Sequence, residues 1–215
     1  MIKFIYFDVA NTLLRKADLV QTIHDEITKK NPSIKLNDLK EKHHNLVHSI
    51  QFPDHTTLEF YIDFNRKLLS LFNISDERLA LDIFHAVKSL DWKPFEDAEH
   101  LIQLNKKFQF GVISNWGDNL LSVLSNHYPK IQFSPLIISS EVGFQKPSDE
   151  IFHLAANKVG YSFNEIMFVG DSLTLDYIPA RKLGMKALLV DRDQTRTYEK
   201  DIVRIHHFSE IDSHL

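Results

Sequence analysis

Five short apolar runs constrain the fold of this chain more than any other feature. Each run is rich in β-branched and aromatic residues and has little polar alternation, which is typical of strands buried on both faces of a parallel sheet. Segments with helical spacing separate the runs, and this alternation predicts a doubly wound, mostly parallel, Rossmann-like α/β fold. The runs are KFIYFDV at 3–9, FQFGVIS at 108–114, SPLIISS at 134–140, IMFVGD at 166–171 and KALLVD at 186–191, with a weaker edge strand near Ile202 to Ile205.

Residues 15–93 interrupt this alternation, because they have helical periodicity and contain no convincing strand. Apolar residues recur at spacings of three and four from Leu58 to Phe72, which predicts one buried helix face. We therefore expect three or four helices, inserted into a core formed by residues 1–14 and 94–215. The predicted N-caps are Asp18, Asn37 and Ser75, and the predicted breaks are Asn31-Pro32 and Phe52-Pro53-Asp54.

The composition argues against several classes of function. A formal net charge of −4, without a dense run of Lys or Arg, argues against a nucleic-acid partner. The chain has no cysteine, which excludes disulfides, thiolate metal sites and a cysteine nucleophile, and which fits a reducing compartment. No stretch reaches the roughly 18 uncharged residues that a membrane-spanning helix needs, so we expect a cytoplasmic protein without a membrane partner.

Polar residues terminate three of the predicted strands. Asp8 ends the first strand, Ser114 and Asn115 end the second, and Asp171 ends the fourth. Because ligands bind beyond the carboxyl ends of strands in open parallel sheets, we expect these side chains to lie close together. Lys146 is a further candidate, since the proline that follows it in GFQKPSDEIF fixes a turn before a predicted helix.

These residue types suit phosphoryl transfer. Asp8 can attack phosphorus as a carboxylate nucleophile, and Asp171 can share a Mg²⁺ ion with it, since hard cations prefer oxygen ligands. Ser114 and Lys146 can donate hydrogen bonds to phosphoryl oxygens. Asp176 lies near the start of the next predicted helix, where it can support the metal site or cap that helix.

Four motifs together resemble those of the haloacid dehalogenase superfamily of hydrolases. They occur in the family's order and span the whole predicted core. The helical segment at 15–93 resembles that superfamily's C1-type cap, because the roughly 31 residues between Asn115 and Lys146 leave no room for the other cap position. The motifs are FDVANTL for the nucleophile, VISN for the second motif, FQKP for the lysine and VGDSLTLD for the acidic metal motif.

The resemblance implies a Mg²⁺-dependent hydrolase that acts on a small phosphorylated substrate. Asp8 would form an aspartyl-phosphate, and its carboxylate would also bind the metal. The further implied metal ligands are the backbone carbonyl of Ala10 and the carboxylate of Asp171, and the residues implied to position the phosphoryl group are Thr12, Ser114, Asn115 and Lys146.

The chain departs from the family pattern at position 10. The pattern is Asp-x-Asp-x-Thr, in which the second Asp protonates the leaving group and then deprotonates the hydrolytic water, whereas this chain has Ala10. A backbone carbonyl is indifferent to the side chain, so the metal site is kept while the acid/base is lost. General acid–base assistance contributes about 10²–10⁴-fold in rate, or roughly 3–5 kcal/mol of barrier.

Three interpretations remain open. The first is a phosphohydrolase whose missing acid/base is dispensable or supplied by another group, and no histidine in the sequence is singled out for that role. The second is a carbon–phosphorus hydrolase or a 2-haloacid dehalogenase; the former needs a Met-Gly-Leu-x-Lys motif that this chain lacks, and the latter works without metal. The third is a phosphate-binding or interaction module that has lost efficient turnover.

Overall fold

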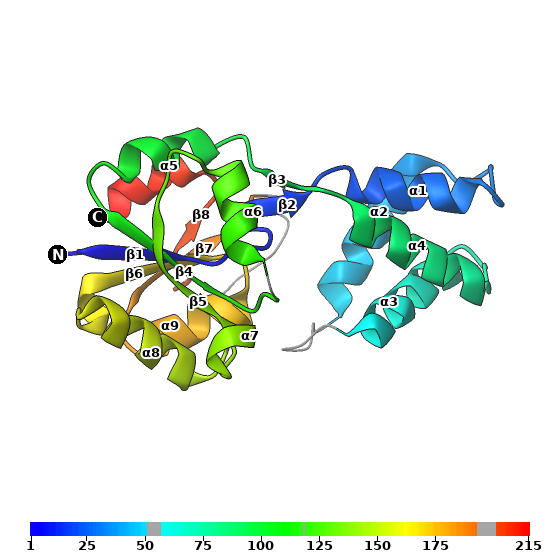
Figure 1. Cartoon of the computed structure of the whole chain (residues 1–215). Coiled ribbons are helices and arrows are strands. Elements are labelled where there is room, and N and C mark those ends of the chain that lie inside the picture. The colour runs from blue at the N-terminus through cyan, green and yellow to red at the C-terminus, as the bar shows by residue number, and fades with distance from the viewer. Residues whose placement is uncertain (51–56, 118, 193–200) are drawn as a thin grey trace. The chain divides into compact units, whose positions relative to one another are not determined.

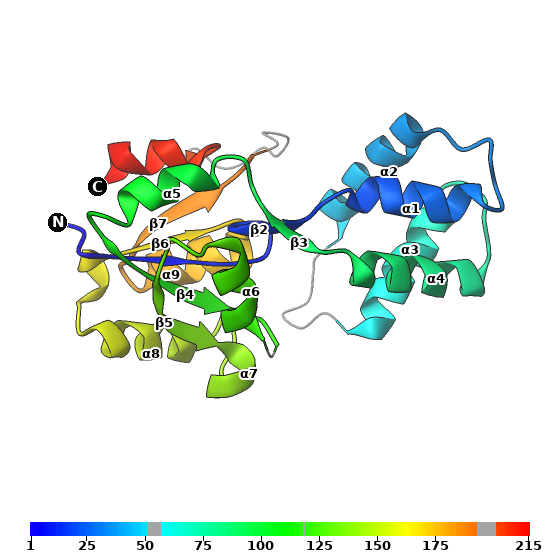
Figure 2. The same ribbon diagram turned by 45° about the horizontal axis from the view of Figure 1, so that its top comes forward.

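The chain divides into two compact units. The computed structural model describes residues 1–50, 57–117, 119–192 and 201–215. Unit 1 consists of Met1–Arg15 and Lys93–Leu215, and unit 2 consists of Lys16–Trp92. Figures 1 and 2 show that unit 1 is a sheet covered by helices and that unit 2 is built mainly from helices.

Unit 1 is built on a six-stranded sheet in the order β5-β4-β1-β6-β7-β8. Every pairing in it is parallel, and the central strand β1 pairs with β4 on one side and β6 on the other. This is the doubly wound arrangement that the sequence predicts. The strands are β1 (Phe4–Phe7), β4 (Gln109–Ser114), β5 (Phe133–Ile138), β6 (Ile166–Gly170), β7 (Lys186–Val190) and β8 (Arg204–Ile205).

Helices cover both faces of this sheet. Helix α5 and the C-terminal η3 lie on one face, and α8 and α9 lie on the other (Figures 1 and 2). The described helices of unit 1 are α5 (Ala98–Leu104), α6 (Leu120–His127), α7 (Ser139–Val142), α8 (Asp149–Val159) and α9 (Ile178–Lys182), with the short turns η1 (Phe163–Glu165), η2 (Leu173–Tyr177) and η3 (Phe208–His214).

The two covered faces explain why β1 has no polar alternation. All four of its side chains are buried. Tyr6 points to the α8 face, where its hydroxyl donates to the carbonyl of Ala155 at 2.8 Å. Phe7 points to the opposite face and makes an edge contact with Phe208 of η3, with ring centroids 6.0 Å apart. Successive residues of a strand face opposite sides, so both sides require apolar residues here.

The strand order places a topological switch point beside β1. The chain runs from β1 to β4 and β5 on one side of the sheet, and then continues with β6, β7 and β8 on the other. The carboxyl ends of β1, β4 and β6 therefore meet at one edge, which is where ligands bind in doubly wound sheets.

Unit 2 contains four helices among its described residues, within the three or four that we expected. Its core is formed by buried residues that include Ile23, Leu68 and Ile83. No helix in the described part of the chain is long and apolar enough to span a membrane. The helices are α1 (Leu19–Thr28), α2 (Leu36–Ser49), α3 (Leu58–Ser70) and α4 (Glu77–Ser89).

The predicted helix starts are only partly correct. Asp18 occupies the N-cap position of α1 but makes no capping hydrogen bond with its side chain. The prediction of Asn37 is wrong, because α2 begins at Leu36. The prediction of Ser75 misses by one residue, since Asp76 accepts the capping bond from the backbone of α4. The predicted break at Phe52-Pro53-Asp54 lies outside the described residues.

Two further expectations about this region are wrong. The predicted buried face of α3 holds for Phe64 and Leu68, but Leu58 and Tyr61 are exposed. A two-stranded sheet was also missed: β2 (Leu14–Lys16) pairs with β3 (Trp92–Pro94), and both strands cross the boundary between the units. Each strand has only three residues, too few to show a period.

Candidate active site

The loop that follows β1 carries Asp8 in a compact turn. The backbone N–H groups of Leu13 and Leu14 both donate to the carbonyl of Val9 at 2.9 Å. Asn11 has a φ of 59°, in the left-handed region that asparagine tolerates better than most residues. The turn holds Asp8 at the end of the strand, where its residue is only 6 % exposed.

Two side chains from other parts of unit 1 donate hydrogen bonds to backbone carbonyls of this loop. The Tyr128 hydroxyl donates to the carbonyl of Leu13 at 2.6 Å, and Arg192 Nη2 donates to the carbonyl of Thr12 at 3.2 Å. Neither residue is among those predicted from the sequence. Arg192 follows β7 by two positions, so the same search for polar residues after strands could have found it, whereas no sequence signal marks Tyr128.

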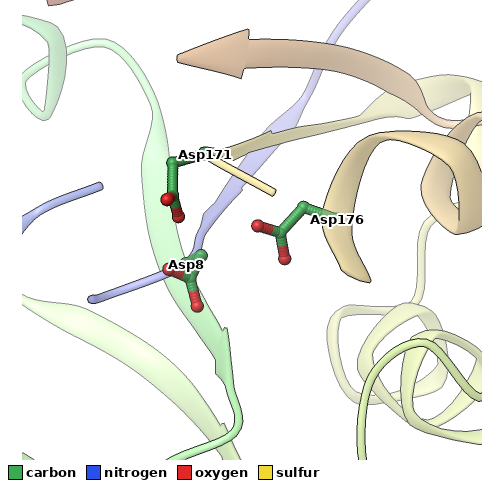
Figure 3. A group of neighbouring side chains, drawn as sticks. All are labelled: Asp8, Asp171 and Asp176. Carbon is green, nitrogen blue, oxygen red and sulfur yellow. The ribbon is translucent and has the colours of Figure 1, made fainter. Parts of the chain in front are cut away.

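Three carboxylates converge beside the loop. Asp8 follows β1, Asp171 follows β6 and Asp176 lies in the turn η2, and each offers an oxygen within 4.8 Å of the others (Figure 3). In Figure 3 the Asp171 side chain points toward Asp8, and the Asp176 side chain points toward the other two. The structure therefore brings together the acidic residues that the sequence placed in two separate motifs.

Asp176 is held against the backbone of β6. Its Oδ2 accepts from the N–H of Ser172 at 3.0 Å, while Ser172 itself supplies the N-cap of η2 by accepting from Leu175. An added Cβ on Gly170 would lie 2.5 Å from Asp176 Cγ, so only glycine at that position leaves room for the carboxylate. The turn η2 is π-helical, a form that is frequent at functional sites.

Lys146 is buried between two of these carboxylates. Its side chain is 2 % exposed, and its ammonium lies 2.7 Å from Asp8 Oδ1 and 2.6 Å from Asp176 Oδ1. Burial lowers the pKa of Lys146, but the charges and hydrogen bonds of the two carboxylates outweigh burial and raise that pKa above its ordinary value. Lys146 is therefore a permanent cation at this site.

Asn115 fixes the backbone of Lys146 from both sides. Its Nδ2 donates to the carbonyl of Lys146, and its Oδ1 accepts from the N–H of the same residue, each at 2.8 Å. These contacts place Asn115 as a support for the lysine loop. Its predicted role in positioning a phosphoryl group stays a prediction.

The two hydroxyl residues of the predicted site bond to the carboxylates. Ser114 Oγ donates to Asp8 Oδ1 at 3.2 Å, and Thr12 Oγ1 donates to Asp171 Oδ1 at 3.3 Å. Both hydroxyl residues are buried. Two hydrogen-bonded groups thus lie side by side at this site. One contains Asp8, Ser114, Asn115, Lys146 and Asp176, and the other contains Thr12 and Asp171.

The charge of the group suits a divalent cation. With all groups ionised, the three carboxylates and the Lys146 ammonium leave two negative charges in a largely buried space. Burial raises the pKa of Asp176 to about 6, against the opposing effect of Lys146. Carboxylate oxygens are the ligands that hard cations prefer, so the donor set fits a metal such as Mg²⁺.

Ala10 supplies no proton at this site. It lies in the same loop as Asp8, is partly buried and forms an isolated bridge with Leu14. A methyl group neither donates nor accepts, so any acid/base function has to come from elsewhere.

A comparison with models of known protein families identifies the family of this chain. A family model for haloacid dehalogenase-like hydrolases matches residues 2–184. The chain belongs to this family. The resemblance inferred from the four motifs is thereby confirmed. The chain spans little more than half the length of the first curated relatives that it matches.

The curated relatives include several phosphatases. The chain is 32% identical over 133 residues to glyceraldehyde 3-phosphate phosphatase of Methanothermobacter thermautotrophicus, a match that covers 58% of this chain and 56% of the relative. It is 25% identical over 210 residues to the enzyme of the same name from Methanocaldococcus jannaschii, covering 94% of this chain and 90% of the relative. It is also 32% identical to the rhythmically expressed gene 2 protein of Drosophila melanogaster, of which the match covers 58%.

Solved structures support the fold of the whole chain. The magnesium-bound putative hydrolase YfnB of Bacillus subtilis superimposes with a TM-score of 0.73 at 20% identity, covering 100% of this chain and 98% of that one. A phosphatase of the family from Thermococcus onnurineus gives a TM-score of 0.59 at 20% identity, covering 99% and 97%. At these identities the likeness concerns the fold alone.

Proposed function

We propose that this hydrolase is a Mg²⁺-dependent phosphohydrolase of a small phosphorylated metabolite, with Asp8 as the nucleophile. The observation that carries the proposal is the convergence of Asp8, Asp171 and Asp176 within 4.8 Å, with the Lys146 ammonium bound to two of them. A cluster of buried carboxylates is costly unless cations balance it, so a chain that had lost phosphoryl chemistry would have little reason to keep it.

The metal ligands of this proposal are Asp8, Asp171 and the backbone carbonyl of Ala10, with Asp176 supporting them. When bound, Mg²⁺ supplies positive charge that lets an anionic phosphate approach a carboxylate. Lys146 adds a permanent positive charge to the same space. The three carboxylates and Lys146 leave two negative charges in the described site. A divalent cation balances both charges, whereas a second ammonium would balance only one.

The chain's own residues account for the first half of the reaction. An Asp8 carboxylate oxygen attacks phosphorus, a phosphorus–oxygen bond forms, and the bond to the leaving group breaks with its electron pair going to the leaving oxygen. Ser114 and Lys146, both within hydrogen-bond distance of Asp8, donate to the phosphoryl oxygens and orient the group. Thr12 and Asn115 complete the positioning by holding Asp171 and the lysine loop.

The second half requires a proton acceptor. Water attacks the aspartyl-phosphate, inorganic phosphate leaves, and the carboxylate of Asp8 is restored once the water has lost a proton. Ala10 cannot take that proton, nor give one to the first leaving group. We therefore propose that the preferred substrates are those that leave without protonation, such as acyl phosphates and activated aryl esters, and that alkyl esters react slowly.

Unit 2 is proposed as the C1-type cap that selects the substrate. It is inserted directly after the loop of Asp8, between Arg15 and Lys93, and it contributes none of the residues assigned above. The names of the curated relatives favour a small phosphorylated metabolite, since glyceraldehyde 3-phosphate phosphatases are among them.

The test is a hydrolysis panel with and without Mg²⁺. The substrates are an acyl phosphate, an aryl phosphate, glyceraldehyde 3-phosphate, another sugar phosphate and phosphonoacetaldehyde, measured for the wild type, Asp8→Asn and Ala10→Asp. We expect Asp8→Asn to abolish turnover, with Asp149→Asn, a partly exposed surface carboxylate, as its control. We expect Ala10→Asp to accelerate alkyl phosphates by about 10²–10⁴-fold, whereas Ala10→Asn, which has the same shape but cannot exchange a proton, gives no gain.

Contrary results would discriminate the alternatives. Turnover that persists in Asp8→Asn refutes the nucleophile assignment. Activity confined to phosphonoacetaldehyde favours carbon–phosphorus hydrolysis. The binding-module interpretation rests on Ala10 itself; it is favoured if neither the wild type nor Ala10→Asp hydrolyses any substrate while both bind Mg²⁺ and inorganic phosphate.

A further inference from the structure

A partly buried guanidinium lies beside the loop that carries Asp8. Arg192 packs between two aromatic rings, with its guanidinium carbon 4.1 Å from the centroid of Phe95 and 4.5 Å from that of Phe208. Its Nη1 donates to Asp97 Oδ2 at 2.6 Å, and its Nη2 donates to the carbonyl of Thr12 at 3.2 Å. The two rings restrict the orientation of the guanidinium. Its two terminal nitrogens then connect Asp97 to the loop that carries Asp8.

Asp97, the carboxylate partner of Arg192, bonds to this arginine and not to its own helix. Asp97 occupies the N-cap position of α5 but makes no capping hydrogen bond to that helix. Its Oδ2 instead accepts from Arg192 and, at 2.9 Å, from the backbone N–H of Phe208. The side chains of the pair are 17% and 4% exposed. Partly burying an ion pair and leaving a helix end without a side-chain cap both cost stability, which suggests that the pair serves a purpose other than stability.

Thr12 connects the pair to the carboxylate cluster. Its carbonyl accepts from Arg192, while its hydroxyl donates to Asp171 Oδ1 at 3.3 Å. A shift of the Thr12 backbone therefore moves the hydroxyl that orients Asp171. The charges are also coupled directly: burial lowers the pKa of Arg192, and the negative charges of Asp97 and Asp171 oppose that effect.

We propose that Arg192 and Asp97 are positioning residues that hold Thr12, and through its hydroxyl Asp171, in the orientation needed for metal binding. For its metal-binding consequence the inference rests on the proposed function. Supporting partners that orient metal ligands typically change metal affinity by about 10–100-fold when they are removed. Arg192 supplies this support through one intervening residue, so the lower end of that range applies.

The experiment measures Mg²⁺ binding directly, by calorimetry on the whole chain under conditions where every variant is folded. Arg192→Met keeps the aliphatic stem but removes the donors, and we expect it to weaken Mg²⁺ binding about tenfold. Arg192→Lys keeps the charge but not the two guanidinium nitrogens that bond to Asp97 and Thr12. We expect it to recover only part of the lost Mg²⁺ affinity. The matched control is Arg204→Met, which removes an arginine paired with Asp191 at the same end of the sheet and leaves Mg²⁺ affinity unchanged.

Two further readouts separate positioning from a general loss of stability. Hydrogen exchange of the Leu13 and Leu14 amides, which bond to Val9, becomes faster in Arg192→Met and not in Arg204→Met. In Arg192→Ala, added methylguanidinium binds between the two rings and restores Mg²⁺ affinity, whereas the same concentration of tetramethylammonium does not. If Arg192→Met is too unstable to measure, Asp97→Asn replaces it, with a smaller loss expected in the same direction.

The outcomes distinguish the two proposals. A wild type that binds no Mg²⁺ refutes the proposed function. A wild type that binds Mg²⁺ while Arg192→Met binds it equally well, with unchanged loop exchange, refutes only the positioning role. An equal loss of affinity in Arg204→Met also refutes it, because the effect would then follow from charge at this end of the sheet rather than from the contact with Thr12.

Discussion

Replacing Lys146 by methionine leaves two buried carboxylates without the cation that joins them. The side chains of Lys146, Asp8 and Asp176 are 2%, 8% and 2% exposed, so water cannot take over from the ammonium. Breaking a buried ion pair by removing one partner costs about 3–5 kcal/mol. We expect Lys146→Met to lower the free energy of unfolding of unit 1 by about that amount at pH 7.

The loss should depend on pH with a defined sign. Burial already raises the pKa of Asp176 to about 6, and the Lys146 charge opposes this effect, so its removal raises the pKa further. When the pKa of a carboxyl is higher in the folded protein than in the unfolded chain, the folded protein holds the proton more tightly. Its free energy of unfolding therefore falls as the pH rises from the unfolded pKa to the folded pKa. Between pH 6 and 8 the variant should lose about 1.4 kcal/mol per pH unit more than the wild type. Adding Asp176→Asn should abolish this difference.

The assay is urea unfolding in the presence of EDTA, so that no metal replaces the ammonium. In a Trp92→Phe background, Trp116 is the remaining tryptophan and its fluorescence reports unit 1. Lys182→Met is the control, because the exposed pair of Lys182 with Asp149 should contribute less than about 1 kcal/mol. A loss below about 1 kcal/mol for Lys146→Met, or a loss that does not change with pH, would refute the reasoning.

Two other predictions concern close packing and a partly buried histidine. Gly170→Ala places a methyl carbon 2.5 Å from Asp176 Cγ, and we expect it to lower the free energy of unfolding in urea by about 1–3 kcal/mol. The control is Gly117→Ala, because a Cβ added there meets nothing within 4 Å, and it should stay within about 0.5 kcal/mol of the wild type. Burial lowers the pKa of His43 to about 4, so unit 2 should lose up to about 3 kcal/mol as pH falls from 6.5 toward 4, since the unfolded chain then binds the proton more tightly. His43→Leu should flatten this dependence and the exposed His85→Leu should not; equal slopes in both variants would contradict the assignment.

The sheet was predictable because its signal is local and repeated. Each buried strand is a continuous apolar run, and the residue types at the ends of the runs pointed to Asp8, Ser114 and Asp171 before any contact was known. The class of fold and the family followed from the same runs and motifs. A parallel sheet brings strand ends together whatever the connecting segments do, so spacing along the chain did not matter.

Contacts made by backbone atoms were not predictable in the same way. Asn115 appears in the sequence as a polar residue after a strand, and nothing in its type shows that both ends of its amide bind the backbone of Lys146. Tyr128 resembles any aromatic residue near a helix end until its hydroxyl is seen on the Leu13 carbonyl. Such partners are determined by three-dimensional register rather than by residue type.

The helical unit shows a different limit. Apolar residues of α3 recur with the expected spacing, yet Leu58 and Tyr61 are exposed while Phe64 and Leu68 are buried. Periodicity gives the direction of a side chain from its own helix, but burial depends on whether another element covers that direction. The prediction was therefore reliable for the type of element and less so for its packing.

The pairing of β2 with β3 has a consequence for how this chain can be altered. The two strands through which the chain leaves unit 1 and returns to it are neighbours in one small sheet, and paired strands lie about 4.8 Å apart. The whole of Lys16–Trp92 is thus a module with adjacent ends, which a short turn or the corresponding module of a relative can replace without changing the path of the remaining chain. If unit 2 selects the substrate, as proposed, that selection can be exchanged or studied apart from the carboxylate site of unit 1.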